Sequence, residues 1–253
     1  MLKQEPTFLI NENLGFPVAE NPWTSILSTA GIQVEVTSDL ARMDQTLTVG
    51  GPAVAYVAGA SFCLMLRRNN PHYRGLVIAT SKFTGEASQR TLLIVRKDDP
   101  AASIDDLQGS DYAYLNRSCS SSFFPPAILL KRKGKQIDSF FNLKQVAGWQ
   151  ARIDAVVAKT VRTTMVLEDV WKMTPGNNEV AKIIGEYSPC VPAVLIVRKD
   201  FDANIVNTLR ENLLSYIPDW DNVYGAFRPF YFADVQNFCH QLTLLSDGEV
   251  NPS

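Results

Sequence analysis

The sequence predicts a two-lobed α/β fold, in which each lobe is a mostly parallel sheet flanked by helices and two crossover strands join the lobes. Three observations lead to this prediction. Strand and helix patterns alternate along the chain, the alternation starts again near the middle, and one six-residue segment occurs twice. The 253 residues are enough for two such lobes, and 46% hydrophobic residues are ordinary for globular domains.

The first third of the chain reads as successive β-α-β units. Asn21 followed by Pro22 is typical of a helix start, and a further helix is expected over 39–47. Apolar or alternating runs predict strands at 8–10, 32–38, 53–59 and 75–80. The order of these elements points to a parallel sheet, because each helix carries the chain back across the sheet.

The middle of the chain repeats the scheme. Helices are expected over 126–134 and 149–159, where Ile153, Val156 and Val157 share one face. Strands are expected at 111–115, 143–148, 163–167 and 180–187. This second alternation predicts a second α/β lobe and not an extension of the first sheet.

The segment LIVRKD occurs at Leu93 and again at Leu195, 102 positions later. We interpret the copies as crossover strands at 92–97 and 194–199, although two edge strands of similar composition also explain the repeat. Lobe 1 then comprises 1–91 with 199–253, and lobe 2 comprises 92–198. The expected ligand site is the cleft between the lobes, which closes about the linking strands.

The end of the chain predicts two helices that return to lobe 1. The first, over 201–217, places Ile205, Leu209, Leu213 and Ile217 at a spacing of four. The second is expected over 230–245.

Composition excludes several functions. A net charge of -2 and a pI near 5.7 argue against nucleic acid as a partner, because phosphate backbones select basic surfaces. No apolar run approaches the roughly 18 residues of a membrane span, so we expect no direct membrane insertion. The four cysteines are far apart and there are two histidines, so we expect no metal centre, no cofactor and no catalytic residue.

The first residues lack the apolar core of a secretory leader. The protein is therefore either cytoplasmic or numbered after removal of a leader, and we prefer the second alternative, a periplasmic protein. We also expect a monomer. The cysteines permit two disulfides without requiring any.

The clearest candidate site is a serine-rich turn after the strand expected at 111–115. Ser118, Cys119, Ser120, Ser121 and Ser122 lie where this strand leads into a helix. The first N–H groups of a helix lack internal acceptors and lie at the positive end of its dipole, so they favour an anion. Serine hydroxyls add donors. The alternative is a capping turn without a ligand.

Four further residues follow predicted strands. Tyr56 either lines the cleft or is a core aromatic, and Trp149 starts a helix at a cleft-facing position or has a structural role. Glu168 and Asp169 either recognise an amine on the ligand or cap the next helix. The glycines at 50 and 51 lack the spacing of a phosphate-binding loop and are expected to form a helix-to-strand turn.

Together these segments resemble the phosphate/phosphonate-binding family of ABC-transporter solute-binding proteins, from about Arg90 to Leu214. The segments that carry the likeness are, in order, LLIVRKDDPAASIDDLQG, YAYLNRSCSSSFFPPAILLKRKG, SFFNLKQVAGWQARIDAVVAK and SPCVPAVLIVRKDFDANIVNTLRENLL. The resemblance implies a type 2 periplasmic-binding-protein fold.

The resemblance also implies that Cys119, Ser120 and Ser121 match the hydroxyl cluster that holds phosphonate oxygens. Tyr56 matches an aromatic residue of the cleft. The sequence departs from the family at Trp149, where a histidine is usual, and at Gln150, where an aspartate is usual. Arg162 replaces a common acidic residue. These departures indicate a ligand that differs from a simple aminophosphonate.

The preferred function is therefore a solute-binding protein that captures a small anionic ligand, such as phosphate, a phosphonate or a phosphate ester, for an ABC permease. One alternative is an enzyme on the same scaffold, of the type found in menaquinone or thiamine-precursor biosynthesis, with Cys119, Glu168 or Asp169 as its reactive groups. The other alternative is the ligand-binding part of a sensor. The fold alone does not distinguish them.

Overall fold

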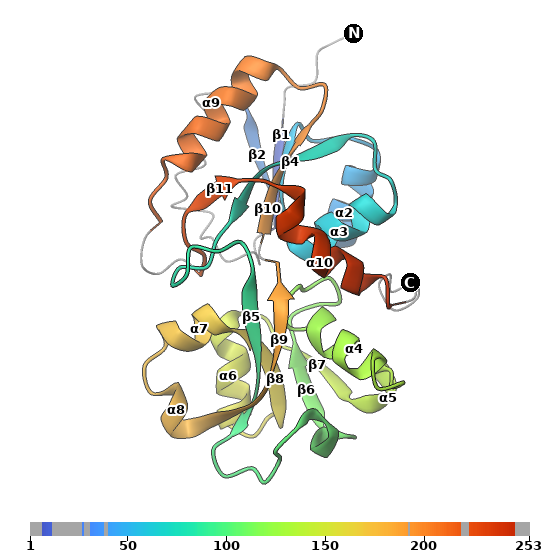
Figure 1. The fold of residues 1–253 in the computed structure, drawn as a ribbon, viewed down its shortest axis with the longest axis vertical. Coiled ribbons are helices and arrows are strands. Elements are labelled where there is room, and N and C mark those ends of the chain that lie inside the picture. The colour runs from blue at the N-terminus through green and yellow to red at the C-terminus, as the bar shows by residue number, and fades with distance from the viewer. Residues whose placement is uncertain are drawn as a thin grey trace. The chain divides into compact units, whose positions relative to one another are not determined.

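The computed structural model describes residues 7–11, 27, 31–37, 40–191, 193–218 and 223–245. The chain divides into two compact units, each built around its own sheet (Figure 1). Unit 1 comprises Met1–Ala87 with Pro192–Val235, and unit 2 comprises Ser88–Val191 with Gln236–Ser253. The predicted two-lobed α/β organisation is confirmed.

Unit 1 contains a six-stranded sheet of order β11-β4-β10-β3-β1-β2. Its strands are β1 Thr7–Asn11, β2 Gln33–Thr37, β3 Val54–Ala58, β4 Tyr73–Ala79, β10 Ala193–Arg198 and β11 Phe227–Pro229. β1 pairs in parallel with β2 and β3, whereas β10 pairs antiparallel with β3 and β4, and β11 antiparallel with β4. The helices with described bounds are α2 Leu40–Thr48, α3 Gly59–Arg67 and α9 Ala203–Leu214.

Unit 2 contains a five-stranded sheet of order β7-β6-β8-β5-β9. Its strands are β5 Gln89–Arg96, β6 Asp111–Tyr114, β7 Asn142–Gln145, β8 Thr163–Leu167 and β9 Ala181–Cys190. β6 pairs in parallel with β7 and β8, and β5 pairs antiparallel with β8 and β9. Its helices are η1 Ile104–Leu107, α4 Phe124–Lys131, α5 Ile137–Phe140, α6 Trp149–Val157, α7 Glu168–Met173 and α8 Asn177–Val180.

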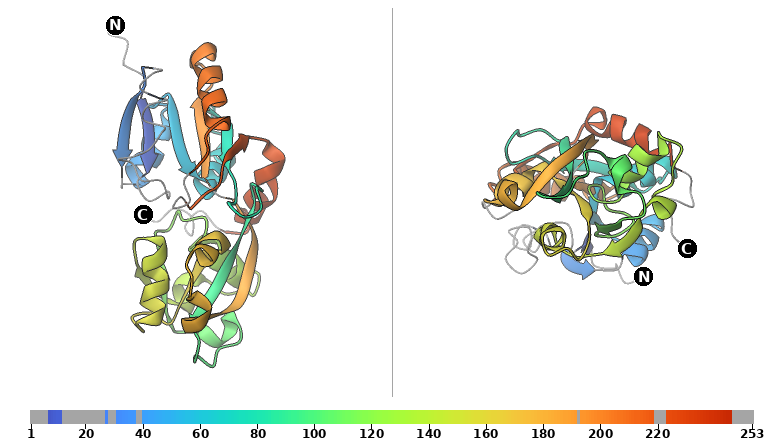
Figure 2. Two further views of the ribbon diagram at one scale, coloured as in Figure 1. Left: turned by 90° about the vertical axis from the view of Figure 1, so that its left-hand side faces the viewer. Right: turned by 90° about the horizontal axis from the view of Figure 1, so that it is seen from below.

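Helices lie on both faces of the unit 2 sheet (Figures 1 and 2). Strands covered on both faces consist of continuous apolar runs, because neither side meets water. All five residues of β8 are buried, including Thr163 and Thr164, whose hydroxyls donate to the carbonyls of Ile94 and Ala113. The sheets are thus mixed: four strands run one way in each unit, and β5, β10 and β11 run the other way.

The two LIVRKD copies lie in different sheets, at the ends of β5 and β10, and our predicted lobe boundaries need correction. The chain enters unit 2 between Ala87 and Ser88 and returns between Val191 and Pro192, ahead of each copy. β10 was expected within lobe 2, but it belongs to unit 1 because it bonds to β3 on one side and β4 on the other.

The end of the chain also differs from the prediction. α10 runs from Phe232 to Leu242, and its residues from Gln236 onward belong to unit 2 and not to lobe 1. α9 buries Leu209 and Leu213 as expected, but Ile217 is 85% exposed because the helix ends at Leu214. The helix expected to start at Asn21 and Pro22 lies outside the described residues.

Candidate functional site

Three predicted site segments lie at one edge of unit 2. The serine turn, residues 118–122, follows β6, Trp149 follows β7, and Glu168 with Asp169 follows β8. β6, β7 and β8 are mutually parallel, so their carboxyl ends share an edge of the sheet. In open α/β sheets ligands bind outside the carboxyl ends of the strands. The topology therefore places these segments on the side of unit 2 where a ligand is expected.

The serine turn presents backbone N–H donors ahead of α4. The Phe123 N–H donates to the Cys119 carbonyl over 3.2 Å, an α-helical bond one turn before α4 begins. The preceding N–H groups, at 121 and 122, lie in the first turn, where a helix offers no internal acceptor. Among the residues that the structure describes, the N–H groups of Ser121 and Ser122 donate to no acceptor. These two N–H groups are the best donors for an anion.

The start of α4 itself, at Phe124, supplies no free donor. Pro125 and Pro126 lack N–H groups, and the Phe124 and Ala127 N–H groups bond to the Cys119 and Phe123 carbonyls. The whole first turn of α4 is buried. The donors thus come from the serine turn and not from the helix that follows it.

The side chains of the serine turn divide into two kinds. Ser122 is fully buried, and its Oγ accepts from the Leu115 N–H over 3.1 Å, which ties the turn back to the end of β6. Ser120 and Ser121 are 8% and 2% exposed, and the Ser121 Oγ lies 3.4 Å from the Cys119 Sγ. Ser118 is half-buried, and its N–H donates a hydrogen bond to the Asn116 Oδ1. Ser122 is therefore held by the scaffold.

Arg152 is a feature of this edge that the sequence analysis missed. It is the largest fully buried side chain, its Nη1 donates to the Gly148 carbonyl over 2.9 Å, and its Cζ lies 5.3 Å from the Trp149 ring centre. Burial raises the pKa of Tyr112, and the positive charge of Arg152 opposes that rise. A buried guanidinium in unit 2 adds a fixed positive charge that favours an anion.

A sequence signal for Arg152 existed. Trp149, Arg152, Ile153 and Val156 follow the i, i+3, i+4, i+7 spacing of one helix face, and Ile153 and Val156 are buried core residues. An arginine on an apolar face is expensive unless a partner compensates it. An arginine among the apolar residues of one helix face therefore indicates a buried cation.

Trp149 is the first residue of α6 and is half-buried. The preceding Gly148 has a φ of 90°, a conformation that glycine adopts readily and that turns the chain sharply into the helix. Because the Arg152 guanidinium faces the Trp149 ring, a cation-π contact fixes the indole where the family usually has a histidine.

Glu168 and Asp169 differ in their surroundings. Both oxygens of Glu168 accept from the Arg90 guanidinium, at 2.9 and 2.6 Å, and Lys172 Nζ lies 3.0 Å away. The hydrogen bonds from Arg90 hold the pKa of Glu168 below its usual range. Glu168 therefore serves an ion-pair network within unit 2, whereas Asp169 is 2% exposed.

Tyr56 lies in unit 1 and is fully buried in the middle of β3, not at a strand end. Its ring meets the Phe227 ring edge-on, with centres 6.3 Å apart, and burial raises the pKa of its phenol. Of the two interpretations of Tyr56, this position agrees with a core aromatic residue.

Arg162 lies at the opposite edge of unit 2, just before β8, and not among the candidate site residues. Its guanidinium binds Asp99 through two bonds, Nε to Oδ2 at 2.8 Å and Nη2 to Oδ1 at 3.0 Å, and Nη1 donates to Ser110. This bidentate pair accounts for an arginine where the family commonly has an acidic residue.

The Arg162–Asp99 pair predicts a pH-dependent part of the stability. Bonds from Arg162 lower the pKa of Asp99, so the pair stabilises the fold above the ordinary carboxyl pKa of about 3.9 and loses this contribution as the pH falls through the lowered value. We expect Asp99→Asn to cost under about 1 kcal/mol at pH 7, because Arg162 is one-third exposed. Urea unfolding between pH 3 and 7 measures it; identical acid slopes in both proteins would contradict the expectation.

Two of the four cysteines are disulfide-bonded, and the other two are free thiols. Cys63 and Cys239 are disulfide-bonded, whereas Cys119 and Cys190 are buried free thiols. Burial raises the pKa of the Cys190 thiol, which donates to the Ser120 carbonyl over 3.2 Å. In the described part of the chain, no three His, Cys, Asp or Glu side chains cluster as metal ligands, and no helix has the length and apolarity to span a bilayer.

Two α/β units, between which the chain passes three times, define the class of two-lobed proteins with a type 2 periplasmic-binding-protein fold. The chain belongs to the family described as ABC transporter, phosphonate, periplasmic substrate-binding protein, which matches residues 27–232. It is thus a member of a family of solute-binding proteins. No curated protein sequence matches the chain.

Solved structures share this fold at low sequence identity. PhnD1 from Prochlorococcus marinus, in complex with methylphosphonate, has a TM-score of 0.73 and 12% identity, covering 94% of this chain and 97% of its own. XAC2383 from Xanthomonas citri, bound to ATP, has a TM-score of 0.69 and 17% identity, covering 95% and 98%. A binding protein component of an ABC phosphonate transporter from Pseudomonas aeruginosa has a TM-score of 0.68 and 13% identity, covering 96% and 90%.

Proposed function

We propose that this protein binds a small phosphonate, phosphate or phosphate ester at the carboxyl edge of the unit 2 sheet and delivers it to an ABC permease. The observation that carries the proposal is the pair of N–H groups at Ser121 and Ser122, which lack acceptors within the described chain. A ligand oxygen at this point would accept hydrogen bonds from these backbone N–H groups and from the Ser120 and Ser121 hydroxyls. The positive charge of Arg152 would also attract it. Hydrogen bonds to a charged group contribute more than neutral ones.

Trp149 and Asp169 complete the proposed site. Trp149 would cover the organic part of the ligand, and Asp169 would accept from an amine where the ligand carries one. Ser118, Cys119 and Ser122 shape the turn, and Glu168 supports the start of α7 through Arg90. Tyr56 contributes to the core of unit 1 and is not needed by this arrangement.

A thermal-shift panel tests the proposal. The probes are inorganic phosphate, methylphosphonate, 2-aminoethylphosphonate and ATP, of which methylphosphonate and ATP are bound in two proteins of the same fold. A probe at a hundred times its dissociation constant should stabilise the folded protein by about 2.7 kcal/mol. For a chain of this size that is a rise of several degrees in the melting temperature.

The panel needs protein refolded from denaturant, so that no carried-over ligand occupies the site. Sulfate serves as the matched anion control, because it has phosphate's shape and lacks its proton. An absence of any rise with all four probes, or an equal rise with sulfate at the same concentration, would contradict the proposed ligand class.

We further propose that the protein binds its ligand without transforming it. A general base works best with a pKa near the operating pH, and the pKa of Glu168 is lowered while both its oxygens are held by cations. Recovery of each probe unchanged after prolonged incubation, followed by phosphorus NMR, is the expected result. Turnover that disappears in Cys119→Ala would favour the enzyme alternative.

Export to the periplasm and action as a monomer are parts of the same proposal. Disulfides persist in oxidising compartments, and Cys63 and Cys239 are disulfide-bonded. The pI near 5.7 and the composition suit a soluble partner of a permease. Fractionation of expressing cells for the location, and light scattering of the purified protein for the mass, test these two points.

A further inference from the structure

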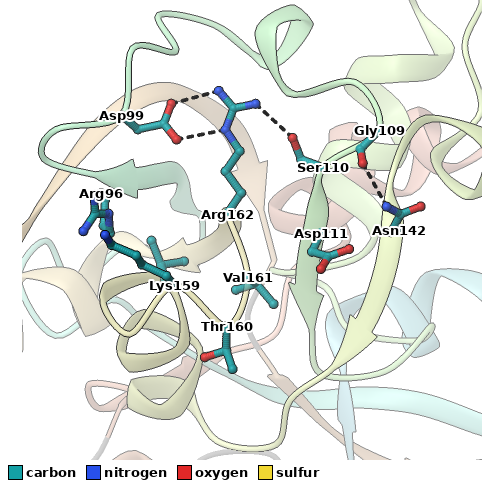
Figure 3. A pocket seen from close by; sticks show the side chains of 11 residues that line it. Arg96, Asp99, Gly109, Ser110, Asp111, Asn142, Lys159, Thr160, Val161 and Arg162 are labelled. Carbon is teal, nitrogen blue, oxygen red and sulfur yellow. Dashed lines mark hydrogen bonds and ion pairs between the residues drawn. The ribbon is translucent and has the colours of Figure 1, made fainter.

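A pocket lies at the edge of unit 2 opposite the serine turn, where β6, β7 and β8 begin (Figure 3). Its volume is about 570 Å³, within the roughly 300–1,000 Å³ typical of small-molecule sites. Its walls come from the turns after β5, before β6 and before β8, and from Asn142 at the start of β7. None of the predicted site residues lines it.

Most charges of this pocket are already paired. Arg162 binds Asp99 bidentately, and the Ala101 N–H also donates to Asp99 over 2.8 Å. Arg96 binds Asp98, which lies outside the lining. In these pairs the charged groups bond to each other, so they are not open to a ligand.

Two charged side chains of the pocket remain without partners in the described chain. Neither Lys159 nor Asp111 makes a side-chain hydrogen bond or ion pair within the residues that the structure covers. In Figure 3, Lys159 and Arg96 are seen on one side of the pocket, and Asp111 and Asn142 on the other. Buried Val156 and Val161 provide an apolar surface. The pocket therefore offers a positive side, a negative side and an apolar patch.

The backbone gives a second, independent reason to single out Lys159. α6 ends in a Schellman motif, in which the Thr160 N–H donates to the Ala155 carbonyl and the Lys159 N–H to the Val156 carbonyl. The same motif ends α2 at Gly50 and α3 at Asn69. Lys159 has a φ of 63°, which glycine and asparagine adopt readily but lysine adopts only at a cost. This conformation singles out the Lys159 side chain, because residues in sparsely populated backbone regions cluster at functional sites.

We propose that this pocket binds a small zwitterion, with an anionic group at Lys159 and an ammonium group at Asp111 and the Asn142 amide oxygen. This second site is separate from the one in the proposed function and does not depend on it. The apolar patch of Val156 and Val161 would contact the carbon chain between the two charged groups.

Titration calorimetry of the whole protein tests the proposal, with 4-aminobutyrate as the probe and butyrate and butylamine as matched monofunctional controls. We expect saturable binding of 4-aminobutyrate, and binding of each control weaker by at least 5-fold. Lys159→Gln and Asp111→Asn should each weaken 4-aminobutyrate binding by at least 5-fold. Lys144→Gln, which removes an exposed lysine outside the pocket, should leave it unchanged.

Lys159→Gly gives a sharper result, because two measurements should move in opposite directions. Relief of the left-handed backbone should raise the melting temperature by about 2 °C, whereas 4-aminobutyrate binding should be lost. Because the variant folds at least as well as the parent, loss of binding cannot be ascribed to unfolding.

Three outcomes would overturn the proposal: no saturable binding of 4-aminobutyrate, butyrate binding as tightly as 4-aminobutyrate, or binding unchanged in Lys159→Gln and Asp111→Asn. The double variant Ser120→Ala with Ser121→Ala should keep full 4-aminobutyrate binding. Loss in that variant alone would place the zwitterion at the serine turn instead, and failure of the phosphonate panel would leave this test unaffected.

Discussion

Replacing Ser120 and Ser121 together by alanine is expected to lower the affinity for the bound phosphonate or phosphate by about 100-fold. A hydrogen bond from a hydroxyl to an anion contributes about 1.5–3 kcal/mol to binding. Each 1.4 kcal/mol or so corresponds to a tenfold change in affinity, so the loss of two such bonds at the lower end of this range gives about 100-fold. The backbone N–H groups of the turn are unchanged in the variant, so residual binding should persist. Calorimetry with the strongest probe of the thermal-shift panel measures the change.

Two single variants serve as controls for this result. Ser139→Ala removes an exposed hydroxyl of α5 in the same unit and should change neither affinity nor stability. Ser122→Ala should reduce stability more than affinity, because the Ser122 Oγ accepts from the buried Leu115 N–H. An unchanged affinity in the Ser120 and Ser121 double variant would show that the anion binds elsewhere.

Tyr112→Phe should destabilise unit 2 by about 2–3 kcal/mol. The Tyr112 hydroxyl donates to the Ser122 carbonyl over 2.7 Å and accepts from the Met165 N–H over 3.0 Å, and the whole side chain is buried. Its removal leaves one buried acceptor and one buried donor unsatisfied, which costs about 1–3 kcal/mol for each group before the surroundings relax. Urea unfolding should show a lower midpoint with an unchanged slope.

The same hydroxyl links the scaffold to the candidate site. The β6–β8 ladder contains the pairs Tyr112–Thr163 and Ala113–Thr164, and the Tyr112 hydroxyl extends it to Met165 while holding the serine turn. Ligand affinity should therefore fall in Tyr112→Phe as well. Tyr231→Phe, at a residue 60% exposed, is the matched control and should have no effect. A loss in the free energy of unfolding below about 0.5 kcal/mol in Tyr112→Phe, which is the effect of an ordinary surface substitution, would contradict this prediction.

Local patterns predicted most elements because burial imposes them on the sequence. The apolar runs at 54–58, 163–167 and 193–198 are strands covered on both faces, and the glycines at 50 and 51 do form the turn between α2 and β3. The two LIVRKD copies begin a few residues after two of the points where the chain changes unit. The repeat did not predict the unit to which β10 belongs, because that depends on backbone bonds to β3 and β4, which are distant in sequence.

Side-chain roles were predicted less well, since they depend on contacts over long sequence separations. Glu168 and Asp169 are adjacent, yet Arg90 holds one of them, 78 positions away. Arg162 was compared with an acidic family residue, while its partner is Asp99, which lies with it at the edge of the sheet opposite the serine turn. The charged member of the apolar face of α6, Arg152, was visible in the spacing and was overlooked.

The sequence by itself determined the two α/β units, the family and the serine-rich turn after β6, because periodicity, turn chemistry and motif order are local properties of the chain. Only the tertiary structure decided which groups of that turn are available to a ligand and which are held by Leu115 and Tyr112. It also placed Arg152 beside Trp149, and it left Lys159 and Asp111 at a pocket without side-chain partners among the described residues. The physical reason is that a donor, an acceptor or a charge is committed by its partner, and partners meet only when the chain folds.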